Sequence, residues 1–199
     1  MFTPAGLHEP RVFVAAVGAR MTEATASVAD GLLLHRFTTP RYVREVTLPA
    51  VEAARRAAGR EHEPFAIRFS PFLVTGSDDA EMTAVATRVK EQIAFYASTP
   101  SYCAVLDLHG WGSLHDELHR LSVAGQWPAM GELIDDDVLN EFAVVAEPEL
   151  LAGAVADRIR GLADRVSLLV PVPVPDELVA AWVRDLQAAP GRGGPATGG

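Results

Sequence analysis

The sequence has a single cysteine, Cys103, no long apolar run and no excess of basic charge. One cysteine excludes an internal disulfide and a zinc cluster built on cysteines. No stretch of 18 apolar residues occurs, so no membrane-spanning helix is expected. The 17 Lys and Arg residues are outnumbered by 26 Asp and Glu, and the net charge of −9 argues against a general nucleic-acid binder, which needs a basic face.

The N-terminal residues, MFTPAGLHEP, do not show the charged region and apolar stretch of a secretory signal. The sequence therefore predicts a cytoplasmic protein. Its composition is typical of a globular chain, since 49% of the 199 residues are hydrophobic and 22% are charged. Residues 190–199 are small and glycine-rich, and we expect them to form a disordered tail.

Four short apolar runs predict buried β-strands, and amphipathic segments between them predict helices. The predicted strands are residues 12–17, 32–34, 65–74 and 166–170. The predicted helices are residues 20–28, 40–58, 78–97, 148–160 and 176–188. Pro71 interrupts the third strand, and Pro49 is expected to kink the second helix.

The region from residue 98 to residue 145 differs, because glycine and proline separate its short apolar pieces. We expect short helices and loops there, packed outside the sheet, with no inner strand. Fully apolar strands that alternate with helices favour a parallel α/β sheet covered on both faces. On this pattern alone the chain is a small open sheet or half of a (β/α)8 barrel, since a complete barrel needs about 250 residues.

Four stretches resemble the luciferase-like monooxygenase superfamily, most closely its actinobacterial oxidoreductases that use the deazaflavin coenzyme F-420 (F420). The stretches are VFVAAVGARMTEATASVADGLLLHRFTTPRYVREVTLPA from Val12, IAFYASTPSY from Ile93, LHGWG from Leu108 and MGELIDDDVLNEFAVVAEPEL from Met130. The resemblance runs from about residue 2 to residue 187. It implies that the four strands are the fifth to eighth of a (β/α)8 TIM barrel, and that MFTP is the linker before the fifth.

The fold that this resemblance implies is the C-terminal half of a TIM barrel. It consists of four parallel βα units in sequential order, with a helical insertion before the last strand. We place this partial barrel domain at residues 1–189. The first four βα units of the family have no counterpart in the sequence.

The end of the first predicted strand carries the candidate cofactor-binding residues. Ala16, Val17 and Gly18 lead directly into a helix, where small residues let the backbone approach an anion and the helix start offers free N–H groups. Arg20 can add a charge-assisted contact. The resemblance implies that these residues grip the phosphate tail of F420, with FMN as the alternative cofactor. The plainer interpretation is that Gly18 is only a strand-to-helix turn residue.

His35 ends the second predicted strand, so it is expected on the same rim as residues 16–20, facing the cofactor or the substrate. The alternative is a histidine that is solvated or bonded to backbone. In the family, the backing of the cofactor ring and most catalytic side chains come from the earlier strands. We therefore name no catalytic residue in this chain.

A second motif that can carry chemistry is the pair His115 and His119, because histidines at i and i+4 share a helix face and can bind zinc. The metalloprotease motif has Glu directly after the first histidine, whereas Asp116 stands here. The sequence favours a polar helix face, with Leu114, Leu118 and Leu121 buried, over a zinc hydrolase, and we expect no metal site. Asp135 likewise favours a helix start over a cation site.

Two functions remain open. The first is an oxidoreductase that transfers a hydride between the deazaflavin or flavin and an unidentified small organic substrate, the ring doing the chemistry. The second is a non-catalytic half-barrel or an assembly piece. In either case the first and fourth strands present open apolar edges, which predict self-association or pairing with an N-terminal half-barrel.

Overall fold

The computed structural model describes residues 10–170 and 172–189, so the predicted tail at 190–199 lies outside the described residues. The main sheet has four parallel strands in the order β1-β2-β3-β6, which confirms the predicted sequential order. The strands are β1 (Phe13–Ala16), β2 (Gly31–Leu34), β3 (Ala66–Phe69) and β6 (Arg165–Val166). This arrangement is that of half a (β/α)8 barrel.

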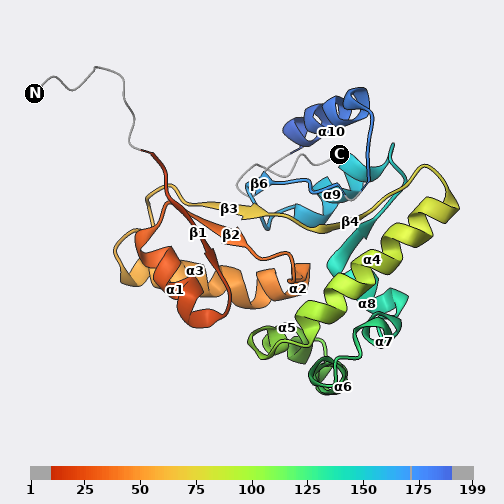
Figure 1. Cartoon of the computed structure of the whole chain (residues 1–199). Coiled ribbons are helices and arrows are strands. Elements are labelled where there is room, and N and C mark those ends of the chain that lie inside the picture. Colours follow the sequence, from red (N-terminus) through yellow and green to blue (C-terminus); the bar gives the residue numbers. More distant parts are fainter. Residues whose placement is uncertain (1–9, 171, 190–199) are drawn as a thin grey trace, which may run out of the picture.

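Two helices, α1 (Ala19–Val28) and α3 (Leu48–Ala57), pack together on one face of the sheet (Figure 1). Side chains alternate between the two faces of a strand, so Leu32, Ile67 and Phe69 all point toward these helices. All three are fully buried, against Ala26 of α1 and Val51 of α3 among others. The apolar runs of the sequence therefore bury their helix-facing residues here.

The predicted helix at 40–58 is continuous but not regular. It consists of α2 (Pro40–Tyr42), a π-helical turn η1 (Val43–Thr47) and α3. Proline has no N–H, and its ring collides with the carbonyl four residues earlier in an α-helix. Pro49 follows the wide turn after one residue, Leu48, whose N–H donates to the Val43 carbonyl. A widened turn thus stands where the sequence predicted a kink.

The predicted strand at 65–74 divides at Pro71 into β3 and β4 (Phe72–Val74). β4 leaves the main sheet and pairs in parallel with β5 (Ala143–Val145) as a separate two-stranded sheet. The prediction that residues 98–145 contribute no inner strand is therefore wrong for the last three residues. A three-residue strand has no periodicity to detect, and only its distant partner defines it.

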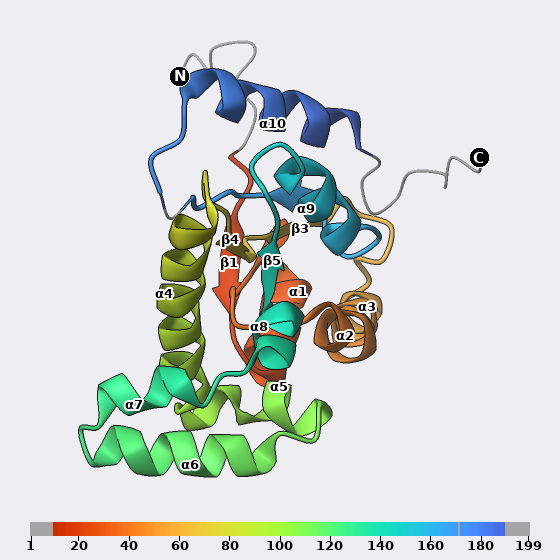
Figure 2. The same cartoon turned by 90° about the vertical axis from the view of Figure 1, so that its right-hand side faces the viewer.

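The remainder of the insertion is helical, as predicted. The long helix α4 (Asp79–Ala97), predicted at 78–97, precedes it. Its own elements are the short 3-10 helix η2 (Pro100–Tyr102), α5 (Cys103–Leu108), α6 (Gly112–Val123), α7 (Trp127–Glu132) and α8 (Asp136–Phe142). Asp78 and Asp135 cap α4 and α8, each accepting an N–H three residues on. Figure 2 shows α5, α6 and α7 grouped at one end of the molecule, with α10 at the other.

The C-terminal part consists of α9 (Leu151–Ile159), β6 and α10 (Asp176–Ala188). The fully buried Trp182 holds α10 in place, and its Nε1 donates to the Pro148 carbonyl at 2.7 Å. β6 has two residues where the sequence predicted a strand from 166 to 170. It is short because β3, its pairing partner, ends at Phe69 just before Ser70 and Pro71.

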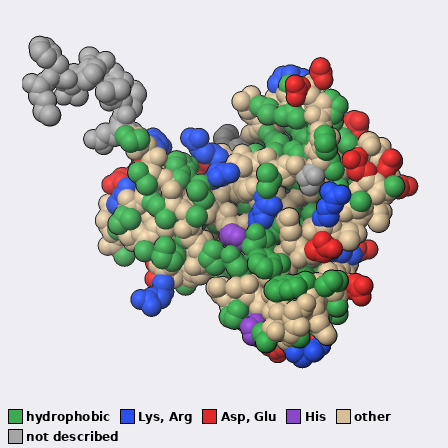
Figure 3. Space-filling view, viewed as in Figure 1, with side chains coloured by type: hydrophobic (Ala, Val, Ile, Leu, Met, Phe, Trp, Pro, Cys, Tyr) green, Lys and Arg blue, Asp and Glu red, His purple; other side chains and the backbone are tan. Residues whose placement is uncertain are grey.

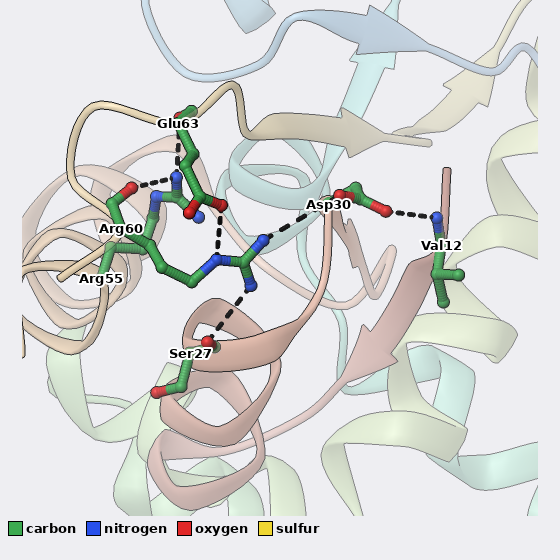
Figure 4. A network of polar contacts seen from close by, with 6 residues as sticks. All are labelled: Val12, Ser27, Asp30, Arg55, Arg60 and Glu63. Carbon is green, nitrogen blue, oxygen red and sulfur yellow. Dashed lines mark hydrogen bonds and ion pairs between the residues drawn. The ribbon is translucent and has the colours of Figure 1, made fainter. Parts of the chain in front are cut away.

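A polar network closes the end of the sheet where the strands begin (Figure 4). Asp30, which precedes β2, accepts the Val12 N–H at 2.7 Å through Oδ2. Arg60 lies 4.0 Å from Asp30 Oδ1, pairs with Glu63 at 2.6 Å and donates to the Ser27 carbonyl. These contacts fix how β1 and β2 enter the sheet. No helix within residues 10–170 and 172–189 combines the length and the apolar character that crossing a bilayer requires.

Candidate functional site

A cleft opens where β1 and β2 end. Ala16 and Leu34 are direct partners in the parallel pair, so Val17 and His35 leave the two strands side by side, as the sequence predicted. The rest of the lining comes from the start of α1, from Phe37 and Thr38, from the segment between α2 and α3, and from residues 101, 102, 104 and 105 of the insertion. None of the described lining residues is acidic. The cleft is partly open and offers about 60 Å³ to the centres of water-sized groups.

Gly18 forms the turn from β1 into α1. Its φ of +76° is in the left-handed region, and a Cβ built on it would meet no atom within 4 Å. The α1 start has no side-chain cap and no acidic residue in its first turn. The first N–H groups of the helix therefore have no partner within the helix itself, and the space in front of Gly18 is open. This is the geometry that a backbone anion site requires.

Arg20 lies in the first turn of α1, on the exposed surface. It is not among the described residues that line the cleft. The structure thus brings Ala16, Val17, Gly18 and His35 together in one wall and leaves Arg20 beside it. The described lining contains no Lys or Arg, so the attraction for an anion rests mainly on backbone N–H groups.

His35 is held by contacts on both ring nitrogens. Nδ1 accepts the Phe37 N–H at 3.1 Å, which leaves the proton of the neutral ring on Nε2, 3.3 Å from the Tyr102 hydroxyl oxygen. The ring stacks on Tyr102 at 4.9 Å and meets Tyr96 edge-on at 4.8 Å. Burial, and secondly the charge of Arg36, lowers the pKa of His35. At neutral pH it is therefore an uncharged donor.

Tyr102 is the cleft residue that the sequence did not single out. Because His35 Nε2 donates to its oxygen, the Tyr102 hydroxyl proton remains available to a group in the cleft. Burial, and secondly the neighbouring Tyr96, raises the pKa of Tyr102, so it stays protonated. Sixty-seven residues separate His35 from Tyr102, and no spacing rule connects them. The signal was the stretch IAFYASTPSY, which carries Tyr102 at its end.

A second contact between a histidine and a hydroxyl group involves Thr39, the residue that follows Thr38 of the cleft lining. His109 Nε2 is 2.8 Å from Thr39 Oγ1, and the ring stacks on Trp111 at 4.5 Å. Thr39 is fully buried and also caps α2 by accepting the Tyr42 N–H at 3.1 Å, so it is a structural residue. Burial is the main cause that lowers the pKa of His109.

His115 and His119 face the end of α4. Their Nδ1 atoms lie 2.7 Å and 2.9 Å from the carbonyl oxygens of Ala97 and Ser98, and the rings stack 5.9 Å apart. Both imidazoles thereby satisfy carbonyls that the helix end leaves free. Within the described residues, no third His, Cys, Asp or Glu joins them in an arrangement that could hold a metal ion.

Related sequences cover most of this chain but only part of their own length. The uncharacterized proteins Rv1360 of Mycobacterium tuberculosis (strain H37Rv) and Mb1395 of Mycobacterium bovis are each 46% identical to it over 189 residues. That alignment includes 94% of this chain and 55% of each relative. The chain therefore spans about half the length of the curated relatives it matches.

Two solved structures share the fold at low identity. The coenzyme F420-dependent tetrahydromethanopterin reductase from Methanopyrus kandleri superimposes with a TM-score of 0.64 at 18% identity, over 88% of this chain and 49% of that enzyme. An F420-dependent secondary alcohol dehydrogenase, solved with an F420-acetone adduct, gives 0.52 at 14% identity, over 81% and 43%. A sequence profile of luciferase-like monooxygenases matches residues 2–165, and the chain belongs to that family.

Proposed function

We propose that this chain binds the phosphate-bearing tail of the deazaflavin coenzyme F420 at the cleft between β1, β2 and α1. In this proposal it forms part of an oxidoreductase that transfers a hydride between that coenzyme and a small organic substrate. FMN is the alternative cofactor. The two fold neighbours named above are F420-dependent enzymes, and family membership is in keeping with the same chemistry.

The open turn at Gly18 carries the proposal. The left-handed φ, the empty space in front of the residue and the uncapped helix start together suit a phosphate held by backbone N–H groups. The absence of acidic groups from the described lining removes the repulsion that would oppose an anion there. Tyr102 adds a hydroxyl donor, and neutral His35 fixes its orientation.

We assign the tail of such a cofactor to this cleft because its distinctive features, the Gly18 turn and the uncapped start of α1, are suited to an anion. When bound, the deazaflavin supplies the hydride chemistry. The residues of this chain would bind and orient its tail, so we assign no catalytic residue among them.

A fluorescence titration of the purified chain with F420, repeated with FMN, tests the proposal. A few exposed phosphate contacts are screened by water and ions, so we expect a Kd of about 100 µM or weaker, rising with salt, and no turnover. Gly18→Val should weaken binding further, because its side chain fills the space that a phosphate needs. Gly59→Val is the matched control, since Gly59 also has a positive φ and open surroundings but lies outside the cleft.

Equal weakening by the two glycine variants would assign the effect to backbone strain and contradict a phosphate site at Gly18. No binding of F420 or FMN at low salt would favour the alternative of a non-catalytic half-barrel. Micromolar or tighter binding with turnover would show that the cleft is more complete than we propose.

A further inference from the structure

A second cavity, called here the β5 cavity, lies beside the two-stranded sheet. It is bounded by α2, η1, the end of α8, β5 and α9, and it shares no described lining residue with the cleft at Gly18. Figure 2 shows β5 between α8 and α9, with α2 to the right. The cavity is open to solvent and offers about 420 Å³ to the centres of water-sized groups. One water needs roughly 10–15 Å³ by such a measure, so a small organic molecule has room there.

Arg158, in the last turn of α9, is the cation of this cavity that the fold holds in place. Its Nη1 donates to the Asn140 carbonyl at 2.8 Å and its Nη2 donates to the Glu141 carbonyl, which closes the C-terminal end of α8. These two bonds use two of the five N–H donors of the guanidinium. Its Nε is buried and, within the described residues, has no hydrogen-bond partner.

The charge of Arg158 is only partly compensated. It forms no ion pair with a carboxylate in the part of the chain that the structure describes. Burial lowers the pKa of Arg158, and the more distant charge of Glu141 opposes this effect without reversing it. A half-buried guanidinium with an orphaned donor and no counter-ion is costly, so an anion brought into this cavity would stabilise it.

Arg44 is the second cation in the cavity wall. It lies in the π-helical turn η1, directly after the fully buried Val43, and its own side chain is exposed. Arg41, nearby on the same helix, pairs with Glu45 at 3.1 Å, whereas Arg44 has no ion pair within residues 10–170 and 172–189. Its charge is therefore available to a ligand in the cavity.

Asp157 is the one acidic residue in the described lining of the β5 cavity. It pairs with Arg160 at 2.5 Å, so its charge is balanced by a residue outside that lining. Two guanidinium groups against one paired carboxylate make the wall locally positive, although the whole chain carries a net charge of −9. Such a local reversal of sign attracts anions.

The remainder of the wall combines neutral donors with apolar surface. Asn140 presents an exposed amide side chain. The Ala146 N–H donates to the Val74 carbonyl of β4, so alternation along β5 points the Val145 N–H away from β4. Val145 is 41% exposed, and with Ala154 it gives the cavity an apolar side.

We propose that the β5 cavity binds a small organic acid, whose carboxylate or phosphate group lies between Arg44 and Arg158. Guanidinium groups bind both kinds of oxyanion through paired N–H donors. The Asn140 amide adds a neutral donor, and the apolar part of the acid lies against Val145 and Ala154. Since no residue of the Gly18 cleft takes part, this site is independent of the function proposed above.

An NMR titration of the ¹⁵N-labelled 199-residue chain tests the site, with succinate and glycerol 3-phosphate as separate probes at constant ionic strength. Basic side chains also gather over the middle of the face seen in Figure 3, so anions are attracted at other places and the measurement must report on the cavity itself. We expect the amide signals of Asn140 and Val145 to shift and saturate, with a Kd of roughly 0.1–1 mM. Binding of either acid supports the proposal, and the tighter one identifies the preferred anionic group.

Arg44→Gln should weaken this binding by at least about tenfold, because it removes one of the two charged contacts. Arg41→Gln is the matched control, since it removes the same charge from the same helix outside the cavity lining. Arg158→Gln also removes the bonds that close α8 and can unfold the chain, so the test rests on Arg44. Equal weakening by Arg44→Gln and Arg41→Gln, shifts that do not saturate, or unmoved signals of Asn140 and Val145 would each overturn the proposal.

Discussion

The ring of Phe13 on β1 lies directly over the α-carbon of Gly31 on β2. A Cβ at Gly31 would lie 2.3 Å from the ring and 2.5 Å from the Ala66 carbonyl oxygen. Since that carbonyl belongs to the neighbouring strand, we expect Gly31→Ala to lower the free energy of unfolding by about 1–3 kcal/mol. Urea denaturation followed by circular dichroism measures the change.

Gly153→Ala in α9 is the matched control for this substitution. A Cβ there meets nothing within 4 Å, and alanine is the better helix former, so we expect a gain of about 0.5–1 kcal/mol. A neutral Gly31→Ala variant would mean that Phe13 and the Ala66 backbone can move apart, and that the strand register is looser than described.

Asp30 is expected to hold the first two strands in register. Asp30→Ala removes the acceptor of the Val12 N–H and the carboxylate beside Arg60, and it should cost about 1 kcal/mol because the site is partly exposed. Asp30→Asn keeps an oxygen in the same place and should cost less. Urea midpoints of the two variants test this, and equal losses would assign the effect to charge rather than to the hydrogen bond.

The two histidines near the cleft predict how stability depends on pH. Burial lowers the pKa of both His35 and His109 below the ordinary value near 6.5. As the pH falls, the unfolded chain takes up protons that the folded chain does not. The free energy of unfolding should therefore decrease from about pH 7 to about pH 5.

The double variant His35→Gln with His109→Gln checks that prediction. It should flatten the dependence of the unfolding free energy on pH over this interval, whatever its stability at neutral pH. The exposed His62→Gln is the control. An unchanged slope in the double variant would show that other groups account for the pH dependence.

The purified chain is expected not to retain zinc through His115 and His119. A structural zinc site has four ligands, and the two imidazoles have no third ligand among the described residues. Metal analysis after dialysis is the measurement. Stoichiometric zinc that is lost in His119→Ala would contradict the expectation and restore a zinc hydrolase as the function.

The main strands and helices could be predicted because each carries its own local pattern. β1 and β2 are apolar runs bounded by Pro, Gly or Asp, and α10 begins and ends at the predicted residues. β5 had no such signal, since Ala143–Val145 becomes a strand only by pairing with β4, about 70 residues earlier. Pairing over such a separation leaves no trace in a local pattern.

The candidate site also contains residues that the sequence could predict and residues that it could not. Val17, Gly18 and His35 were predictable, because parallel strands bring their carboxyl ends to one rim. The contribution of Tyr102 was not, since it depends on how the insertion folds back over that rim. Arg20 was expected at the anion site because it is near in sequence, but the first turn of α1 carries it to the exposed surface beside the cleft.

The π-helical turn at residues 43–47 has a consequence for how this helix can change in evolution. The turn holds one more residue than an α-helical turn, and only Leu48 separates it from Pro49. Deleting one residue there alone would force Pro49 into a regular helix and onto a carbonyl. Replacing Pro49 alone would leave the π-helical turn in place, although no proline would then require it. The two features form an epistatic pair, and homologous chains should gain or lose them together.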